Sequence, residues 1–272
     1  MNRTKPLYRA TLTGLLIVTA VFIPRRTQAL EDYTSPRNAD IPVAGAKSIR
    51  IDAAAGVLKV EGREGLDQVH VRGTARSDRK SRLDGIKLIA ERRGDEIYIK
   101  ADMPDDRDGY FGRNGDDWDN MALDLVIEVP SSLPLDVDDG SGEAEFNNTG
   151  ALEFEDGSGE IHVRGARGDV RISDGSGSIV IEGVQGSVRI SDGSGEIRAR
   201  DVTGNFTVEE DGSGNIDVSS VGGTMRVEND GSGNIDVDRV SGDFVVDRDG
   251  SGSIRYDTVK GSVRIPDRRR RG

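Results

Sequence analysis

The sequence predicts an all-β fold, a β-solenoid or β-helix built from ~19-residue two-strand coils with Gly-rich turns. The tetrapeptide Asp-Gly-Ser-Gly recurs seven times, and the spacings between successive copies are 17, 18, 18, 19, 19 and 19. Between its copies, apolar and polar residues alternate with the period of half-buried strands. Gly occurs 36 times and aromatics make up only 4%, which leaves little material for one large globular core. The copies begin at Asp139, Asp156, Asp174, Asp192, Asp211, Asp230 and Asp249.

Residues 1–29 have the features of a signal peptide. A basic start precedes an apolar stretch, Leu12–Ile23, which is too short to span a bilayer. Thr27-Gln28-Ala29 then offers a small-residue cleavage site. We expect cleavage after Ala29, no transmembrane span in the cleaved protein, and an extracytoplasmic location in the periplasm, at the cell surface or in the medium. The alternative is an uncleaved anchor, because Arg25 and Arg26 follow the apolar stretch.

Composition excludes several classes of function. The formal net charge is −12, and residues 1–29 carry five cations and no anions, which leaves −17 on the remainder. Such an acidic surface argues against nucleic acid as a partner. The absence of Cys excludes disulfides, thiolate metal sites and a cysteine nucleophile.

The segment before the repeats divides into two parts. Residues 30–43 contain Pro36 and Pro42 and are interpreted as a linker. Residues 44–138 show strand-like alternation and no helical period, which predicts an irregular β lead-in that caps the stack. The expected strands are Ser48–Asp52, Gly56–Glu61, Gln68–Arg72, Ile86–Glu91, Glu96–Ala101 and Ala122–Val129.

Residues 139–267 form the repeat solenoid. Counting each tetrapeptide Asp as position 1, positions 6 and 8 are almost always apolar, as in Ile161 and Val163, and the residue between them is usually polar. A further Gly near position 13 precedes a second alternating strand, such as the one containing Val170 and Ile172. Gly is needed where φ must be positive and where successive backbones lie close. One coil cannot bury enough apolar surface alone, so stability must come from stacking coils about 4.8 Å apart.

The tetrapeptide Asp residues have two interpretations. In the first, each carboxylate accepts a backbone N–H two residues on, in an Asx-turn that shapes the corner. In the second, the carboxylates form a line of Ca²⁺ sites, as in Ca²⁺-binding rolls, which require Gly-Gly-x-Gly-x-Asp. Only Asp217 and Asp236 stand where that motif needs its Asp, which favours the Asx-turn.

The segment from Met103 to Met121 is the best candidate for a specific site. Acidic and aromatic side chains together suit a cation or a sugar ring. The alternative is a solvated hairpin excursion, and Pro104 breaks the EF-hand pattern. The candidate metal ligands, with Ca²⁺ the only cofactor considered, are Asp105, Asp106, Asp108, Asp116, Asp117 and Asp119. The candidate ligand-binding residues are Tyr110, Phe111 and Trp118.

Other polar residues are interpreted as surface features. His70 and His162 lie between apolar neighbours, point outward and match no metal or triad spacing. The basic tail, residues 268–272, follows Pro266 and protects the open end of the stack from edge pairing. A broken basic row either binds anionic glycan or balances surface charge, and it comprises Arg171, Arg189, Arg226 and Arg264.

The chain also resembles a known family. The matching segments are Val57–Gly62 (VLKVEG), Ile127–Pro130 (IEVP) and strand pairs introduced by Gly-Ser-Gly, such as Gly212–Val218 (GSGNIDV). In this order they resemble the bacterial "putative adhesin" domain of unknown function, which is related to head-GIN-like β-solenoids. The resemblance covers about residues 44–267. It implies the fold and supplies no catalytic residue or cofactor.

Together these observations predict an exported, non-enzymatic envelope or surface protein, an adhesin-like solenoid used for interaction or structural display. Its partner is unknown, with envelope glycan or surface proteins the classes considered. One alternative is a β-helix carbohydrate-active enzyme, but such enzymes form a cleft from loops inserted at the turns, and none interrupts Asp139–Ile265. The other is a binding module that senses cations or envelope stress through the 103–121 segment.

Overall fold

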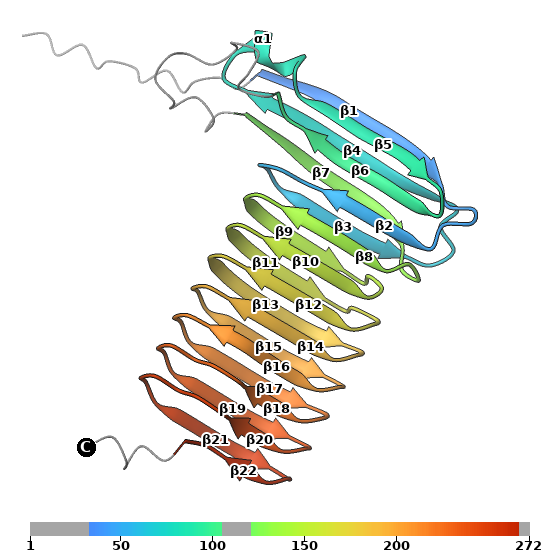
Figure 1. Cartoon of the computed structure of the whole chain (residues 1–272). Coiled ribbons are helices and arrows are strands. Elements are labelled where there is room, and N and C mark those ends of the chain that lie inside the picture. Colours follow the sequence, from blue (N-terminus) through green and yellow to red (C-terminus); the bar gives the residue numbers. More distant parts are fainter. Residues whose placement is uncertain (1–32, 105–120, 267–272) are drawn as a thin grey trace, which may run out of the picture. The chain divides into compact units, whose positions relative to one another are not determined.

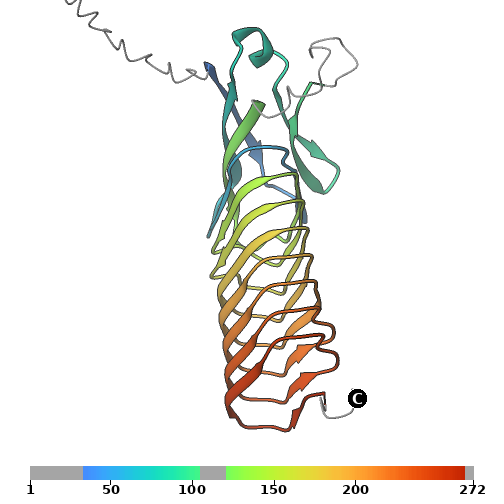
Figure 2. The same cartoon turned by 90° about the vertical axis from the view of Figure 1, so that its left-hand side faces the viewer.

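The computed structural model describes residues 33–104 and 121–266. Its strands form two sheets of 11 strands each, which face one another around a continuous core (Figures 1 and 2). In the repeat region the chain alternates between the sheets, so that each coil contributes one strand to each. The predicted β-solenoid of two-strand coils is therefore confirmed.

Sheet A contains the first strand of every coil. Its order is β1-β4-β7-β3-β9-β11-β13-β15-β17-β19-β21. The bounds are β1 Tyr33–Pro42, β3 Leu58–Arg63, β4 Gln68–Ser77, β7 Met121–Pro130, β9 Gly142–Asn147, β11 Gly159–Arg164, β13 Gly177–Val184, β15 Ile197–Val202, β17 Ile216–Val221, β19 Ile235–Val240 and β21 Ile254–Val259.

Sheet B contains the second strand of every coil. Its order is β22-β20-β18-β16-β14-β12-β10-β8-β2-β6-β5. The bounds are β2 Ser48–Asp52, β5 Lys87–Arg93, β6 Glu96–Asp102, β8 Leu135–Asp139, β10 Leu152–Asp156, β12 Val170–Asp174, β14 Val188–Asp192, β16 Phe206–Asp211, β18 Met225–Val227, β20 Phe244–Val246 and β22 Val263–Arg264.

Successive coils pair in parallel and, with one exception, in strict register. Val170 lies opposite Val188 and Asp174 opposite Asp192, so equivalent residues stack in columns. The exception is a bulge in β16, where Ile190 pairs with Val208 but Ser191 pairs with Glu210. The skipped residue, Glu209, accounts for the lengthening of the repeat by one position at this coil.

The core confirms the predicted inward positions. Ile161, Val163, Val170 and Ile172 are all at most 1% exposed. The two sheets interlock where the ring centroids of Phe146 and Phe154 lie 4.9 Å apart, edge to face. The alternation in each strand therefore fills one apolar layer between the sheets.

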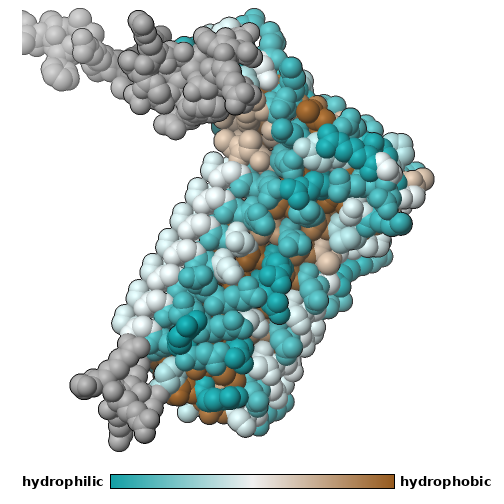
Figure 3. Space-filling view, viewed as in Figure 1, coloured by the Kyte–Doolittle hydropathy of each residue, from teal (hydrophilic) through white to brown (hydrophobic). Residues whose placement is uncertain are grey.

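Two corners of each coil require a residue with positive φ. The second Gly of the tetrapeptide has positive φ, and a Cβ on Gly195 would lie 1.4 Å from the carbonyl oxygen of Gly177 one coil earlier. These Gly-Ser-Gly turns follow the pale ridge along one edge of the stack (Figure 3). Position 10 is also left-handed, even without Gly: φ is 58° at Asp201 and 54° at Arg239. The residue type at this second corner varies from coil to coil, so the repeat pattern gives no signal for it.

The lead-in is more regular than predicted. Strands β2 and β3 form an additional coil that pairs in parallel with β8 and β9, although the whole segment from β4 to β7 separates the two pairs in sequence. The expected linker at residues 30–43 was wrong where the structure describes it. Residues 33–42 form the strand β1, which pairs antiparallel with β4 at the end of sheet A. An edge strand tolerates Pro36 and Pro42, because its outward amides need no partner. A short helix, α1, spans Lys80–Leu83, and no described helix has the length and apolarity needed to cross a membrane.

Candidate functional site

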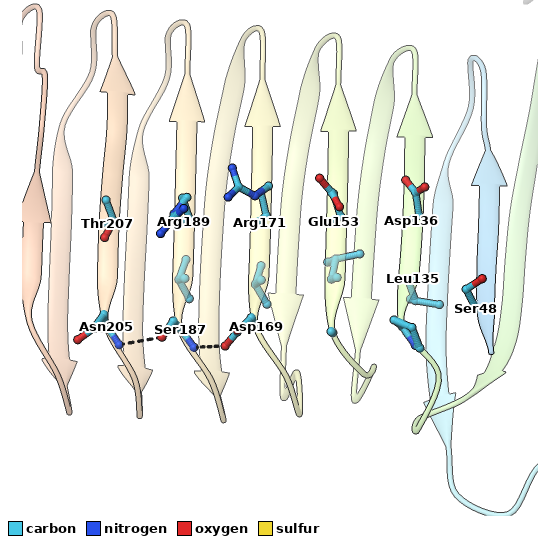
Figure 4. A pocket seen from close by; sticks show the side chains of 15 residues that line it. Ser48, Leu135, Asp136, Glu153, Asp169, Arg171, Ser187, Arg189, Asn205 and Thr207 are labelled. Atoms are coloured by element: carbon cyan, nitrogen blue, oxygen red, sulfur yellow. Dashed lines mark hydrogen bonds between the residues drawn. The ribbon is translucent and has the colours of Figure 1, made fainter.

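A shallow groove of about 490 Å³ crosses the outer face of sheet B. It runs over β2, β8, β10, β12, β14 and β16, so that consecutive coils each contribute equivalent side chains (Figure 4). Asp136 and Glu153 lie toward one end, and Arg171, Arg189 and Thr207 follow on the next strands. The groove thus presents a row of polar groups at the spacing of adjacent strands.

One edge of the groove is a hydrogen-bonded column of short polar side chains at position 14. The backbone N–H of Ser187 donates to Asp169 Oδ1 at 2.8 Å, and that of Asn205 donates to Ser187 Oγ at 3.2 Å (Figure 4). The backbone N–H of Thr224 continues the column to Asn205 Oδ1 at 2.8 Å. Each side chain therefore fixes the coil that follows it. The sequence signal for this column is the Asp, Ser, Asn or Thr that recurs directly after the Gly at position 13 of each of these coils.

The two basic side chains in the groove share one acid, Glu209, which comes from the bulge. Glu209 lies 3.2 Å from Arg189 Nε and 3.7 Å from Arg171 Nη1, and so bridges two coils. At the acidic end, Arg50 Nη1 binds Asp136 Oδ2 at 2.7 Å. Further along the basic row, Arg226 forms ion pairs with Glu228 and Asp247. Arg171, Arg189 and Arg226 of this row therefore each form an ion pair with an acid.

The seven tetrapeptide Asp residues form a buried column, here called the Asp ladder. Each is at most 8% exposed, and Asp211 is fully buried. The Asx-turn prediction is confirmed where the N–H groups of Ser158, Ser176 and Ser194 donate to Oδ1 of the Asp two residues earlier, at 3.0–3.2 Å. The second carboxylate oxygen has no hydrogen-bond partner in Asp139, Asp156, Asp174 and Asp192. The lead-in coil ends the ladder, because its bridge Ala55–Ser141 places Ala53 opposite Asp139.

Burial controls the ionisation of the ladder. Loss of solvation raises the pKa of Asp139 to about 7, and the neighbouring Asp156 carboxylate adds to the effect. Burial likewise raises the pKa of Asp174 to about 6 and that of Asp211 to about 7, again with contributions from adjacent ladder residues. Hydrogen bonds from the turn amides oppose these shifts but do not cancel them.

The Ca²⁺ roll was the less favoured interpretation of the tetrapeptide Asp residues, and the two residues that match its motif are Asp217 and Asp236. Asp217 and Asp236 are register partners on the strands β17 and β19, where their positions alternate with buried core residues. They therefore face outward, whereas the ladder carboxylates are buried. Within residues 33–104 and 121–266, no three His, Asp or Glu side chains are arranged to hold a metal ion.

The other sequence-predicted residues are placed as follows. His70 Nδ1 lies 2.8 Å from Asp40 Oδ1, and His162 Nε2 lies 3.0 Å from Glu160 Oε1, both on the outer face of sheet A. The candidate ligands Asp105, Asp106, Asp108, Asp116, Asp117 and Asp119 lie outside the described residues. The same holds for Tyr110, Phe111 and Trp118, for the signal-like residues 1–29 and for the tail, residues 268–272.

Comparison with models of known families gives a match that covers most of the chain. The family model described as Toastrack DUF4097 matches residues 46–271. No curated protein matches the chain.

Solved structures with a similar fold share little sequence with it. A "putative adhesin" from Bacteroides fragilis is 10% identical, with a TM-score of 0.41, and the match covers 85% of this chain and 96% of that one. A "putative lipid binding protein" from Parabacteroides distasonis is 15% identical, with a TM-score of 0.42 and coverage of 84% and 96%. A "putative cell adhesion protein" from Clostridium sporogenes is 11% identical, with a TM-score of 0.33 and coverage of 86% and 99%. Likenesses of this size carry no argument about function.

Proposed function

Because the chain belongs to the Toastrack family, we propose that it is an exported, non-enzymatic protein of the cell envelope or surface that binds an extended, hydroxyl-rich envelope glycan along the groove of sheet B. The observation that carries the proposal is the groove itself. A polymer lying across the strands would meet an equivalent polar side chain at each coil, about 4.8 Å apart.

The chemistry of the groove favours a neutral glycan. Ser187, Asn205 and Thr207 offer hydroxyl and amide groups, which can both donate and accept hydrogen bonds. The guanidinium groups of Arg171 and Arg189 already share one acid, Glu209, so an anionic polymer would compete with that acid for them. Hydroxyl groups of a sugar can instead bind beside the ion pairs without breaking them.

We propose a non-enzymatic role because the carboxyl groups whose pKa is raised lie where they cannot contact a substrate. Glycoside hydrolysis uses two carboxyl groups flanking the sugar, one of them with a raised pKa. In this protein burial raises the pKa of Asp139, Asp174 and Asp211, and all three lie inside the stack, at most 8% exposed. In the groove, Asp136 is held by Arg50.

The binding proposal is tested with a glycan array and a matched pair of variants. The double variant Arg189→Ala/Thr207→Ala removes two groups from the groove, and we expect its binding to envelope glycans to fall at least tenfold. Arg200→Ala/Ser219→Ala makes the same kind of change on the outer face of sheet A, where Arg200 pairs with Glu182 at 2.8 Å. Equal binding by both variants, or no glycan bound by the parent, would refute the proposal.

Export is tested separately by cell fractionation and N-terminal sequencing. We expect the mature chain in an extracytoplasmic fraction, with Leu30 as its first residue. Recovery of intact Met1 in the membrane fraction would favour the uncleaved anchor, and recovery in the cytoplasm would contradict export altogether.

A further inference from the structure

The last coil exposes residues whose equivalents are buried in every preceding coil. Tyr256 in β21 is 48% exposed, whereas its equivalents Val218 and Val237 are at most 4% exposed. Val263 and Ile265 are 36% and 40% exposed. Hydrophobic residues are visible at this lower end of the stack (Figure 3). An apolar layer and the outer edges of two sheets therefore end together at the last coil.

The two ends of the stack differ in their capacity to pair with another strand. At one end, sheet A stops at β1, which carries Pro36 and Pro42 and so lacks two amide donors. At the other end, sheet A stops at β21, which contains no Pro and pairs with no further strand among the described residues. If two copies associated head to tail, β21 of one copy would have to pair with β1 of the other, which contains proline. If they associated through their C-terminal ends, each β21 would pair with a strand that contains no proline.

Only one register of β21 self-pairing places opposite charges together and keeps the core side chains on one face. In an antiparallel pair centred on Tyr256, Arg255 of each copy lies opposite Asp257 of the other, and the two Tyr256 side chains meet on the core side. If the register shifts by two residues in one direction, Arg255 lies opposite Arg255 of the other copy. If it shifts by two in the other direction, Asp257 lies opposite Asp257 of the other copy. Odd shifts would place core side chains on the outer face. The charges of β21 therefore favour the register centred on Tyr256, which forms two opposite-charge pairs.

The neighbouring strands support the same arrangement. In β19 the register partner of Arg255 is Asp236, and that of Asp257 is a second acid, Asp238. An arginine from another copy would therefore lie beside two acids, Asp257 and its register partner Asp238.

Sheet B contributes apolar contact about the same axis, and the edge protection expected from Pro266 and the basic tail applies to its last strand, β22. The ring of Phe244 lies 5.9 Å from that of Tyr256, and Phe244 is the register partner of Val263 in β22. Val263 thus lies on the sheet opposite Tyr256. A two-fold axis perpendicular to the sheets would bring both residues onto their copies and cover the exposed apolar end.

We propose that two copies of this chain associate through their C-terminal coils as a two-fold symmetric dimer, with β21 paired antiparallel to β21 about Tyr256 and Arg255 bound to Asp257 of the other copy. This association is independent of the proposed glycan groove.

The test is analytical ultracentrifugation of the mature full chain at low and high micromolar concentration and physiological salt. We expect a dimer for the parent. Arg255→Asp and Asp257→Arg each place like charges opposite one another twice, and each should weaken dimerisation tenfold or more. The double variant Arg255→Asp/Asp257→Arg exchanges the charges and should restore it. Only the two-fold register pairs these residues across copies, so the rescue is specific to it.

Arg198→Asp is the matched control, because Arg198 has the position of Arg255 in a coil inside the stack and pairs with Glu196. It should leave the dimer intact. A monomeric parent throughout the concentration range would overturn the proposal. A dimer that tolerates both single variants, or single variants that the charge exchange fails to rescue, would also overturn it. Circular dichroism of each variant distinguishes loss of dimer from loss of fold.

Discussion

Asp174 and Asp192 lie opposite one another in adjacent parallel strands, both are more than nine-tenths buried, and one oxygen of each carboxylate has no hydrogen-bond partner. Two such groups cannot both be ionised without cost, because each lacks solvation and repels the other. Burial accordingly raises the pKa of Asp174 to about 6 and also raises that of Asp192. The ladder therefore makes stability depend on pH.

The stack should be more stable in mild acid than at neutral pH. A raised pKa means that the folded ladder holds protons that the unfolded chain, with an ordinary Asp pKa of 3.8, has already lost. The stabilisation that the protonated ladder gives the folded state is complete below the pKa of Asp in the unfolded chain. It is lost as the pH rises towards about 7. Glu145, whose pKa is lowered by hydrogen bonds from Asn147 and Lys59, acts in the opposite direction in stronger acid. Melting temperatures should therefore fall between about pH 4.5 and about pH 7.5.

Asp174→Asn identifies the source of this dependence. The amide oxygen can still accept the Ser176 N–H but carries no charge, so the variant should gain at most about 3 kcal/mol at pH 7.5 and show a shallower slope. Asp217→Asn, on the outer face of sheet A, should leave the slope unchanged. A parent whose stability rises steadily across this range would contradict the prediction.

Gly195→Ala should destabilise the stack far more than Gly183→Ala. Both glycines have positive φ, but the added Cβ would lie 1.4 Å from the Gly177 carbonyl oxygen in the first case and 3.8 Å from the nearest atom in the second. We expect a loss of about 1–2 kcal/mol at Gly183 from backbone strain alone and more than about 4 kcal/mol at Gly195. Urea unfolding of the two variants measures the difference. Equal losses would show that the turn can shift to accept a side chain.

Deletion of one whole coil should be tolerated. Removing Asp192–Glu210 joins Ser191 to Asp211, which pairs with Asp192 in the parent, so every remaining inward residue keeps its direction. The variant should fold with one coil fewer, because each coil contacts mainly its neighbours.

Deletion of Asp192–Asp201 removes only half a coil and should prevent folding. It fuses Ser191 in sheet B to Val202 at the end of a sheet A strand, so the coil cannot close in register. Circular dichroism and thermal melting of both deletions against the parent give the comparison. A half-coil deletion that melts as cooperatively as the whole-coil deletion would show that the two-strand unit is wrong.

Glu209→Ala should increase binding to anionic glycans. Glu209 lies beside Arg171 and Arg189, and its removal leaves both guanidinium groups available to sulfate or carboxylate groups. Retention on a heparin column should rise, whereas Glu160→Ala on sheet A removes the same charge beside His162 and should have a smaller effect. Equal retention of the two variants would show that only net charge matters.

The fold was largely predictable because its signals are local and repeated. The inward direction of Ile161 and Val163, and the need for Gly at the tetrapeptide turn, follow from alternation and from tight corners within one coil. The predicted linker at residues 30–43 was wrong for a non-local reason. Pro36 and Pro42 indicate a break in the chain unless a neighbour such as β4 holds the segment as an edge strand. The groove was missed as a site, because its members lie a whole coil apart in sequence.

The sequence by itself determined the length of the coil, the residues that face the core, the glycine corners and the acidity of the surface, since each depends only on spacing within one repeat or on composition. Only the tertiary structure decided that β2 and β3 extend the same stack, that the Asp ladder is buried, that Glu209 bridges Arg171 and Arg189, and that Tyr256 is half exposed in the last coil. The physical reason is that burial and charge pairing are properties of neighbouring strands. Which strands become neighbours is settled when the whole stack forms.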